Sequence, residues 1–212
     1  MKKVYFIGGL GADKRIFSFL NLSFCKPIFI DWITPVPKES LKEYALRLRK
    51  QIDDESPIVV GISFGGMLIT EMAKADPLLK GIILASNKTS KEFPAYLRIG
   101  KYLPLYKWAP SGLSKKTMLA NSWILGGIHE PQKKLLYEIV KDSNMFFVKW
   151  AIGAILRWEN NATPKNIIHI HGTADKLLPF RLVKADFKII NGTHILTMDQ
   201  PGEVSELLKK LI

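Results

Sequence analysis

Short runs of apolar, mostly β-branched residues recur along the chain, and each ends at turn residues. They are Val4–Ile7, Ile28–Ile30, Ile58–Val60, Ile82–Leu84, Ile167–Ile170 and Phe187–Ile190. Nearly every position within a run is apolar, whereas a strand with one solvated face would alternate between apolar and polar residues. The pattern therefore predicts about six strands that are covered on both faces.

Helical spacing of apolar residues lies between several of these runs. It is clear over residues 41–52, over residues 65–75 directly after the third run, and over residues 202–212. Because strands alternate with helices, the chain is predicted to form a doubly wound α/β fold with a mostly parallel sheet and helices on both faces.

The alternation stops over residues 87–162, where no convincing strand pattern occurs. Helical spacing follows Pro131 and again covers residues 146–158, and four of the five tryptophans lie in this segment. Residues 87–161 carry 12 Lys and Arg against 5 Asp and Glu. We predict a basic, all-helical cap (87–162) inserted into an α/β core made of residues 1–86 and 163–212.

Composition fits one ordinary globular domain, with 47% apolar and 24% charged residues in 212. The single cysteine, Cys25, excludes an internal disulfide and any multi-cysteine metal site. No apolar run approaches the roughly 20 residues that a membrane span needs. The start, MKKVYFIGGLGA, is basic and then apolar like a secretory signal, but its apolar part is short and broken by glycine. We therefore expect a cytoplasmic protein.

The net charge of +12 at pH 7 raises the question of a nucleic-acid partner. No block of five or six like charges occurs, and the lysines are spread as pairs such as Lys115-Lys116 and Lys209-Lys210. Phosphate binding uses clustered cations, so we expect solvated basic faces and no nucleic-acid partner. Weak attraction to anionic substrates or anionic lipid surfaces stays open.

A glycine-rich stretch follows the third predicted strand and surrounds one serine, in the order Gly61-Ile62-Ser63-Phe64-Gly65-Gly66. A serine between a strand and a helix is forced into a strained turn that exposes its hydroxyl group. Side chains at Gly61 and Gly65 would collide across that turn. Ser63 is therefore our candidate nucleophile, and the backbone N–H of Phe64 is a candidate donor to an oxyanion.

A carboxylate and an imidazole follow the next two strand ends. Asp175 lies in the stretch HGTAD after the fifth predicted strand, and the stretch NGTH delivers His194 after the sixth. His194 is the histidine that follows both a strand end and the acid, so we assign it as the general base and Asp175 as its orienting acid. His169 and His171 alternate on a predicted buried strand, where core packing is the expected role rather than metal binding.

The loop after the first strand, GGLGAD, is expected to supply the second oxyanion donor, the backbone N–H of Leu10. Asp13 is expected to cap a helix that begins near Lys14. The motifs GISFGG, HGTAD and GTH, in the order Ser63, Asp175, His194, resemble those of the α/β-hydrolase superfamily over residues 1–86 and 163–212. The resemblance implies a sheet trimmed to about six strands, a cap after the fourth strand and a backbone oxyanion hole.

These residues predict a serine hydrolase that cleaves a small carboxylic ester or thioester through an acyl-enzyme, without a metal or other cofactor and without an obligatory protein partner. Apolar cap residues are the candidate walls of the substrate pocket, although each also suits simple packing of the cap onto the sheet. They are Met118, Trp123, Phe146, Phe147 and Trp150.

Two other classes of protein share parts of this pattern. Gly9 and Gly11, with Asp31 about 20 residues on, imitate a dinucleotide-binding fingerprint, but Lys14 stands where its third glycine belongs. Tyr137 and Lys141 match the Tyr-x-x-x-Lys pair of nicotinamide-dependent oxidoreductases, yet they lie in the predicted cap. The other alternative is a ligand-binding or signalling member of the same fold with little turnover.

Overall fold

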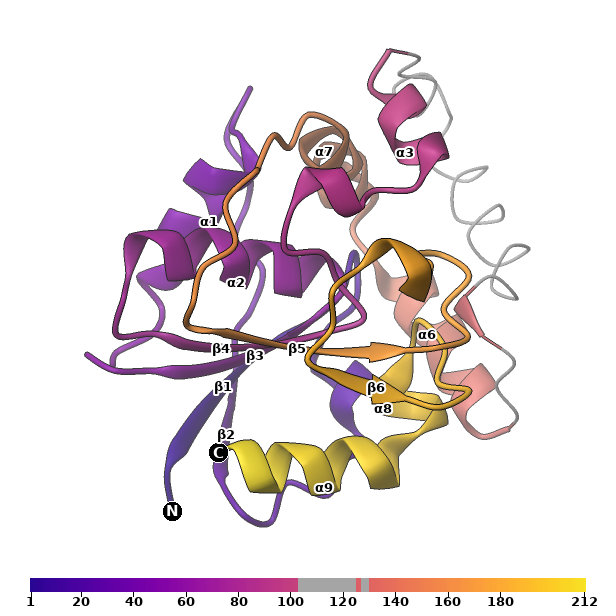
Figure 1. Cartoon of the computed structure of the whole chain (residues 1–212). Helices are drawn as coiled ribbons and strands as arrows, with labels where there is room; N and C mark the ends of the chain where they lie inside the picture. The colour runs from indigo at the N-terminus through magenta and orange to yellow at the C-terminus, as the bar shows by residue number, and fades with distance from the viewer. Residues whose placement is uncertain (103–124, 127–129) are drawn as a thin grey trace.

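The computed structural model describes residues 1–102, 125, 126 and 130–212 (Figure 1). Six strands form one sheet in the order β2-β1-β3-β4-β5-β6, and every neighbouring pair is parallel. The strands are β1 (Lys3–Ile7), β2 (Lys26–Phe29), β3 (Ile58–Ile62), β4 (Lys80–Leu84), β5 (Ile167–Gly172) and β6 (Phe187–Ile189). Each predicted apolar run is confirmed as a strand, and the predicted α/β fold class is confirmed.

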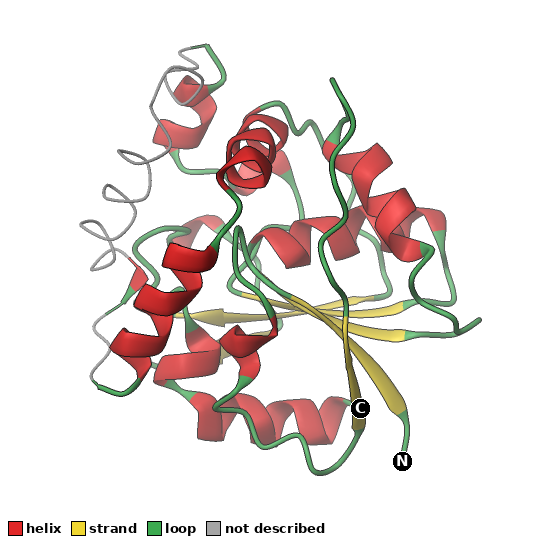
Figure 2. Ribbon diagram, turned by 180° about the vertical axis from the view of Figure 1, so that it is seen from behind, coloured by secondary structure: helices red, strands yellow, loops and turns green. Residues whose placement is uncertain are grey.

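Strands β1, β3, β4 and β5 are mostly apolar because helices lie on both faces of the sheet, whereas the edge strands β2 and β6 are partly exposed (Figures 1 and 2). Along β1, Tyr5 and Ile7 pack into one hydrophobic cluster, while Val4 and Phe6 pack into the other. Successive side chains of a strand point to opposite faces, so neither position tolerates a polar residue here.

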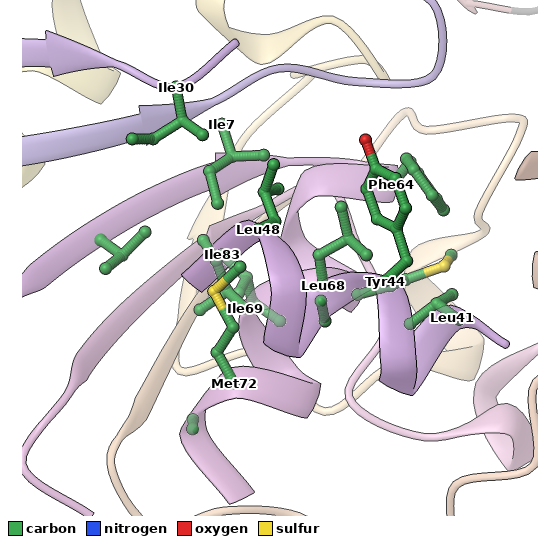
Figure 3. Close-up of a cluster of buried hydrophobic side chains, with 14 of the residues drawn as sticks. Ile7, Ile30, Leu41, Tyr44, Leu48, Phe64, Leu68, Ile69, Met72 and Ile83 are labelled. Carbon is green, nitrogen blue, oxygen red and sulfur yellow. The ribbon is translucent and has the colours of Figure 1, made fainter. Parts of the chain in front are cut away.

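Helices α1 (Leu41–Arg49) and α2 (Phe64–Ala75) cover the first face. Helix α1 begins at Ser40, whose hydroxyl group accepts the N–H of Glu43 while the Glu43 carboxylate accepts the N–H of Ser40. The buried side chains of both helices interlock over the strands, as Figure 3 shows for residues that include Tyr44, Leu48, Leu68, Ile69 and Met72.

The second face carries the short helices η1 (Lys14–Phe17) and α8 (Leu196–Asp199) and the longer α9 (Pro201–Leu211). As predicted, Asp13 caps η1, accepting the N–H of Arg15. The crossover from β5 to β6 holds only the single turn η4 (Phe180–Leu182), as its short length required.

Between β4 and β5 the structure describes a turn, η2 (Ser90–Glu92), and the helices α3 (Ala95–Gly100), α6 (Gln132–Asp142) and α7 (Met145–Leu156). Buried residues of α6 join the cluster on the second face, and buried residues of α7 join the cluster on the first. The described helices of this segment thus share the two cores of the sheet. That residues 87–162 form a separate cap stays a prediction.

Strand β1 lies between β2 and β3, so the chain leaves β1 toward one edge and returns on its other side. In open parallel sheets the carboxyl ends of strands at such a reversal border a crevice that holds ligands. The loops after β1 and β3, which carry Leu10 and Ser63, therefore lie at the expected place for a site. Of the helices that the structure describes, none combines the length and apolarity that crossing a membrane requires.

Candidate active site

Ser63 occupies a sharp turn between β3 and α2, with φ 54° and ψ −117°. A non-glycine residue with these angles is strained, and the strain must be held by its surroundings. A Cβ atom on Gly61 would lie 2.6 Å from Ile69 Cδ1 and 2.8 Å from the Gly65 backbone carbon, and one on Gly65 would overlap the backbone at the end of β1. Glycines flank Ser63 because the turn leaves no room for side chains.

The turn is also tied to β4. The Ser63 N–H donates to the Leu84 carbonyl at 2.9 Å, and the buried hydroxyl group of Ser86 donates to the Ser63 carbonyl at 2.7 Å. These two bonds fix the backbone on either side of the Ser63 side chain, and the hydroxyl group of Ser63 itself faces a cavity.

His194 follows β6 and meets Ser63 across the end of the sheet. Its Nε2 lies 2.8 Å from Ser63 Oγ, and its Nδ1 lies 2.9 Å from Asp175 Oδ2. The backbone holds the ring in place, because the N–H of His194 donates to the Leu125 carbonyl and that of Thr193 donates to Asp199 Oδ2. A carboxylate accepts only, so Nδ1 carries the proton of the neutral ring and Nε2 is free to accept the serine proton.

Asp175 is buried, and its two carboxylate oxygens are held by different groups. Oδ1 accepts the backbone N–H groups of Leu177 and Leu178, at 2.9 and 2.8 Å, while Oδ2 faces His194. Burial alone raises the pKa of Asp175, but the charge of His194 and the hydrogen bonds from His171, His194 and Leu178 outweigh it. The pKa of Asp175 therefore lies well below its usual range, and its carboxylate is ionised at neutral pH.

The two predicted oxyanion donors lie in suitable positions. Among the described residues, the N–H groups of Leu10 and Phe64 have no acceptor. Phe64 is the first residue of α2, where the N–H groups and the positive end of the helix dipole favour negative charge. Leu10 lines the same cavity as Ser63. That these two groups bind an oxyanion stays a prediction.

The cavity above Ser63 has a volume of about 320 Å³. Its walls come from the loop after β1 and from helices α3, α6 and α7, and Ser63 and His194 lie on its floor. Aliphatic side chains dominate the walls, and they include Ile16, Leu97, Leu136, Ile139, Val140, Ile152, Ile155 and Leu156. Among the described residues of the wall, no Asp, Glu, Lys or Arg occurs.

Solved structures with this arrangement of elements cover almost the whole chain. A hydrolase from Pseudomonas aeruginosa PA01 aligns with a TM-score of 0.78 at 12% identity, over 99% of this chain and 89% of that one. A thermophilic esterase from Thermogutta terrifontis aligns with a TM-score of 0.73 at 13% identity, over 100% and 89% of the two chains. A lipase-esterase related protein from Clostridium acetobutylicum ATCC 824 aligns with a TM-score of 0.73 at 16% identity, over 100% of this chain and 94% of that one. The chain has the α/β-hydrolase fold.

No protein-family model and no curated protein sequence matches the chain. The likeness to these structures is one of fold. The α/β-hydrolase fold hosts several chemistries, so activity has to be argued from the site itself.

The predicted aromatic pocket is wrong for the residues that the structure describes. Phe146 is 65% exposed, and Phe147 and Trp150 pack with Trp32, Tyr44 and Phe64 over α1. None of the three predicted residues lines the cavity in this α/β-hydrolase fold. Helix α7 turns Ile152, Ile155 and Leu156 toward the cavity instead. Met118 and Trp123 lie outside the described residues.

Two histidines of β5 lie closer to the site than the sequence indicated. His169 and His171 are fully buried, as expected for core residues of the α/β-hydrolase fold, but His171 Nε2 lies 3.3 Å from Asp175 Oδ2. The available signal was the four-residue spacing of His171 and Asp175 in HGTAD. Across the described ranges, no cluster of three or more His, Cys, Asp or Glu side chains is arranged to hold a metal ion.

Proposed function

We propose that the protein is a serine hydrolase that cleaves a small carboxylic ester through an acyl-enzyme. The observation that carries the proposal is the hydrogen-bonded line from Ser63 through His194 to Asp175, with bonds of 2.8 and 2.9 Å. These three groups are remote in sequence and arrive from three different strand ends. The strained turn at Ser63 supports the proposal, because such strain persists where exposure of a side chain is needed.

The reaction follows from the protonation states of the three residues. Ser63 Oγ attacks the ester carbonyl carbon while its proton moves to His194 Nε2, and the carbonyl oxygen, now negative, is received by the N–H groups of Leu10 and Phe64. When the bond to the leaving alcohol breaks, His194 returns the proton to the alcohol oxygen, and an acyl group remains on Ser63. A water molecule then repeats the sequence in reverse, with Asp175 balancing the charge of the imidazolium at each stage.

The cavity supports an uncharged, aliphatic substrate. A cavity of roughly 150 Å³ holds a benzene molecule, so about 320 Å³ accommodates on the order of a dozen carbon atoms. An ionised group among these aliphatic walls would lose its hydration without a partner. We therefore propose acyl groups of medium length, and the same machinery extends to the corresponding thioesters.

Two measurements test the proposal together. A fluorophosphonate probe is expected to label Ser63 of the wild type, and Ser63→Ala is expected to abolish labelling and to lower kcat for a chromogenic hexanoate ester at least about 10⁴-fold. Ser23→Ala, which removes an exposed hydroxyl group from a remote loop, serves as the matched control and should change neither.

The outcomes separate the alternatives. Wild-type-like turnover in Ser63→Ala would refute the assignment of the nucleophile. Labelling of Ser63 without turnover of any ester in a chain-length panel would favour a ligand-binding protein of the same fold. A protein that is neither labelled nor active on esters, but binds a nicotinamide dinucleotide, would favour an oxidoreductase.

A further inference from the structure

A chain of buried imidazoles continues beyond Asp175. His169 and His171 are alternate residues of β5, so both point to the same face of the sheet. His169 Nε2 lies 3.0 Å from His171 Nδ1, and the two rings meet edge to face. His171 Nε2 in turn lies 2.7 Å from the Leu178 carbonyl oxygen and 3.3 Å from Asp175 Oδ2. The reaction described above uses neither histidine.

The partners of the two rings fix where their protons are. The Leu178 carbonyl and the Asp175 carboxylate only accept, so His171 Nε2 carries the proton of the neutral ring. That N–H donates to the Leu178 carbonyl, and Asp175 Oδ2 lies 3.3 Å from the same nitrogen. The Nδ1 of the neutral ring then has a lone pair, which accepts the Nε2–H of His169. His169 Nδ1, which has no partner within the described part of the chain, is consequently a bare acceptor. With this assignment every buried N–H of the two rings has an acceptor. A buried N–H without an acceptor would cost more free energy than the one ring nitrogen that lacks a donor.

Polar N–H groups thus surround both oxygens of the Asp175 carboxylate. The N–H groups of Leu177 and Leu178 bind Oδ1, the Nδ1–H of His194 binds Oδ2, and His171 Nε2 lies 3.3 Å from the same oxygen. The donor on His171 restrains rotation of the carboxylate and withdraws part of the negative charge that faces His194. Because Oδ2 is the atom that orients His194, His171 has a direct route to the geometry and basicity of the general base.

We propose that His171 is a positioning residue, which acts on His194 through Asp175, and that His169 holds His171 in the required tautomer. The proposal rests on the proposed function, since it assigns a task to residues behind the same triad. The surrounding groups are consistent with it. Lys88 and Asp186 form an ion pair near His169, and the backbone N–H of His169 donates to Asp186 Oδ2. The hydroxyl group of Tyr96 is engaged by the Leu177 carbonyl.

Two amide substitutions separate positioning from packing. In His171→Gln the side-chain N–H reaches the place of Nε2, so it retains the donor to Leu178 and Asp175. In His171→Asn the shorter amide reaches only the place of Nδ1, so it keeps contact with His169 and loses Asp175. We expect His171→Asn to lower kcat about 10- to 100-fold with little change in KM, and His171→Gln to recover most of that loss.

The pH profile gives a readout that a purely structural role would not move. Without the His171 donor, Asp175 holds the proton on His194 more firmly, so the acid limb of the kcat/KM profile should move to higher pH in His171→Asn and return in His171→Gln. All rates are to be expressed per fluorophosphonate-labelled site, which removes any contribution from unfolded protein. Equal profiles in all three proteins, or a loss in His171→Gln as large as in His171→Asn, would overturn the proposal.

A measurement without turnover distinguishes this failure from failure of the proposed function. Histidine-selective ¹⁵N NMR of the wild type should show neutral His169 and His171 with the proton on Nε2, and His194 with the proton on Nδ1. The Nδ1 proton signal of His194 should shift in His171→Asn and not in His171→Gln. A protonated His171 Nδ1, or a His194 signal indifferent to both variants, would contradict the positioning role even if the protein hydrolysed no ester.

Discussion

If the protein is the proposed ester hydrolase, the room in its cavity should limit the length of the acyl chain, and Ile152, which lines the cavity, is the residue to change. This residue lines the cavity from α7 and is only partly buried, although it is aliphatic. It does not belong to either hydrophobic cluster of the sheet. A larger side chain at this position therefore takes space from the substrate and leaves the core in place.

The expected magnitude follows from the burial of methylene groups. Each substrate methylene buried in an apolar pocket contributes about 0.8 kcal/mol, or close to a fourfold increase in kcat/KM, until the pocket is full. Phe exceeds Ile in volume by about one methylene group, so Ile152→Phe removes room for roughly one substrate methylene, worth about 0.8 kcal/mol. We expect the ratio of kcat/KM for octanoate to that for acetate to fall about fourfold, with the acetate rate almost unchanged.

The assay is a series of p-nitrophenyl esters from acetate to decanoate on the wild type, Ile152→Phe and the volume-conserving control Ile152→Leu. In the wild type kcat/KM should rise with chain length and then level off, and in Ile152→Phe it should level off earlier. A uniform loss at every chain length would point to a disturbed triad. An unchanged length profile in Ile152→Phe would refute the assignment of this cavity to the acyl chain.

Further predictions concern the turn, acid stability and the basic surface. In Gly66→Ala the new Cβ would lie 2.5 Å from Ser86 Oγ, so we expect the free energy of unfolding, measured by urea denaturation, to fall by about 1–3 kcal/mol. The matched control is Gly202→Ala, because the space around Gly202 is open. Burial, reinforced by the electrostatic influence of the neighbouring His171 and Lys88 side chains, keeps the pKa of His169 well below the usual imidazole value. The unfolded chain alone therefore binds that proton below about pH 6.5, and the free energy of unfolding should fall there by up to about 1.4 kcal/mol per pH unit. His169→Gln should flatten the dependence of the free energy of unfolding on pH between about pH 4 and 6.5. The loss of stability that comes from the lowered pKa of Asp175 begins only below about pH 4. An unchanged slope in His169→Gln would contradict the conclusion that the buried His169 stays neutral in the folded protein. Binding to phosphatidylserine vesicles, if the net charge of +12 drives it, should disappear at about 1 M salt, while kcat/KM for an uncharged ester stays constant.

The sheet and the arrangement of Ser63, His194 and Asp175 could be predicted because each depends on a restrictive local pattern. A short apolar run that ends at turn residues favours a strand inside a covered sheet, and all six such runs are strands, although the edge strands β2 and β6 are partly exposed. The turn at Ser63 is equally restrictive, because Gly61 and Gly65 are needed where a Cβ would strike Ile69 or the end of β1. Since parallel strands end at one edge, the residues after the strand ends had to lie near one another.

The walls of the cavity could not be predicted for a related reason. Helix α7 is apolar on almost every side, so its sequence does not say which residues face the sheet, the cavity or solvent. Phe147 is buried and Trp150 is partly buried among aromatic neighbours from the loop after β2 and from α1, and Phe146 remains exposed. Size and aromaticity favoured these three residues, whereas the cavity is formed by the smaller Ile152 and Ile155.

The position of His171 could be predicted from the sequence only in part. Alternation on β5 correctly placed His169 and His171 on one buried face, and burial of a neutral imidazole is explained by packing alone. The loop that follows changes the argument, because it returns Asp175 to within reach of the same ring nitrogen that binds the Leu178 carbonyl. A strand pattern gives the face of a residue but not the path of the next loop. The donor that restrains the Asp175 carboxylate is therefore visible only once β5 and its loop are folded together.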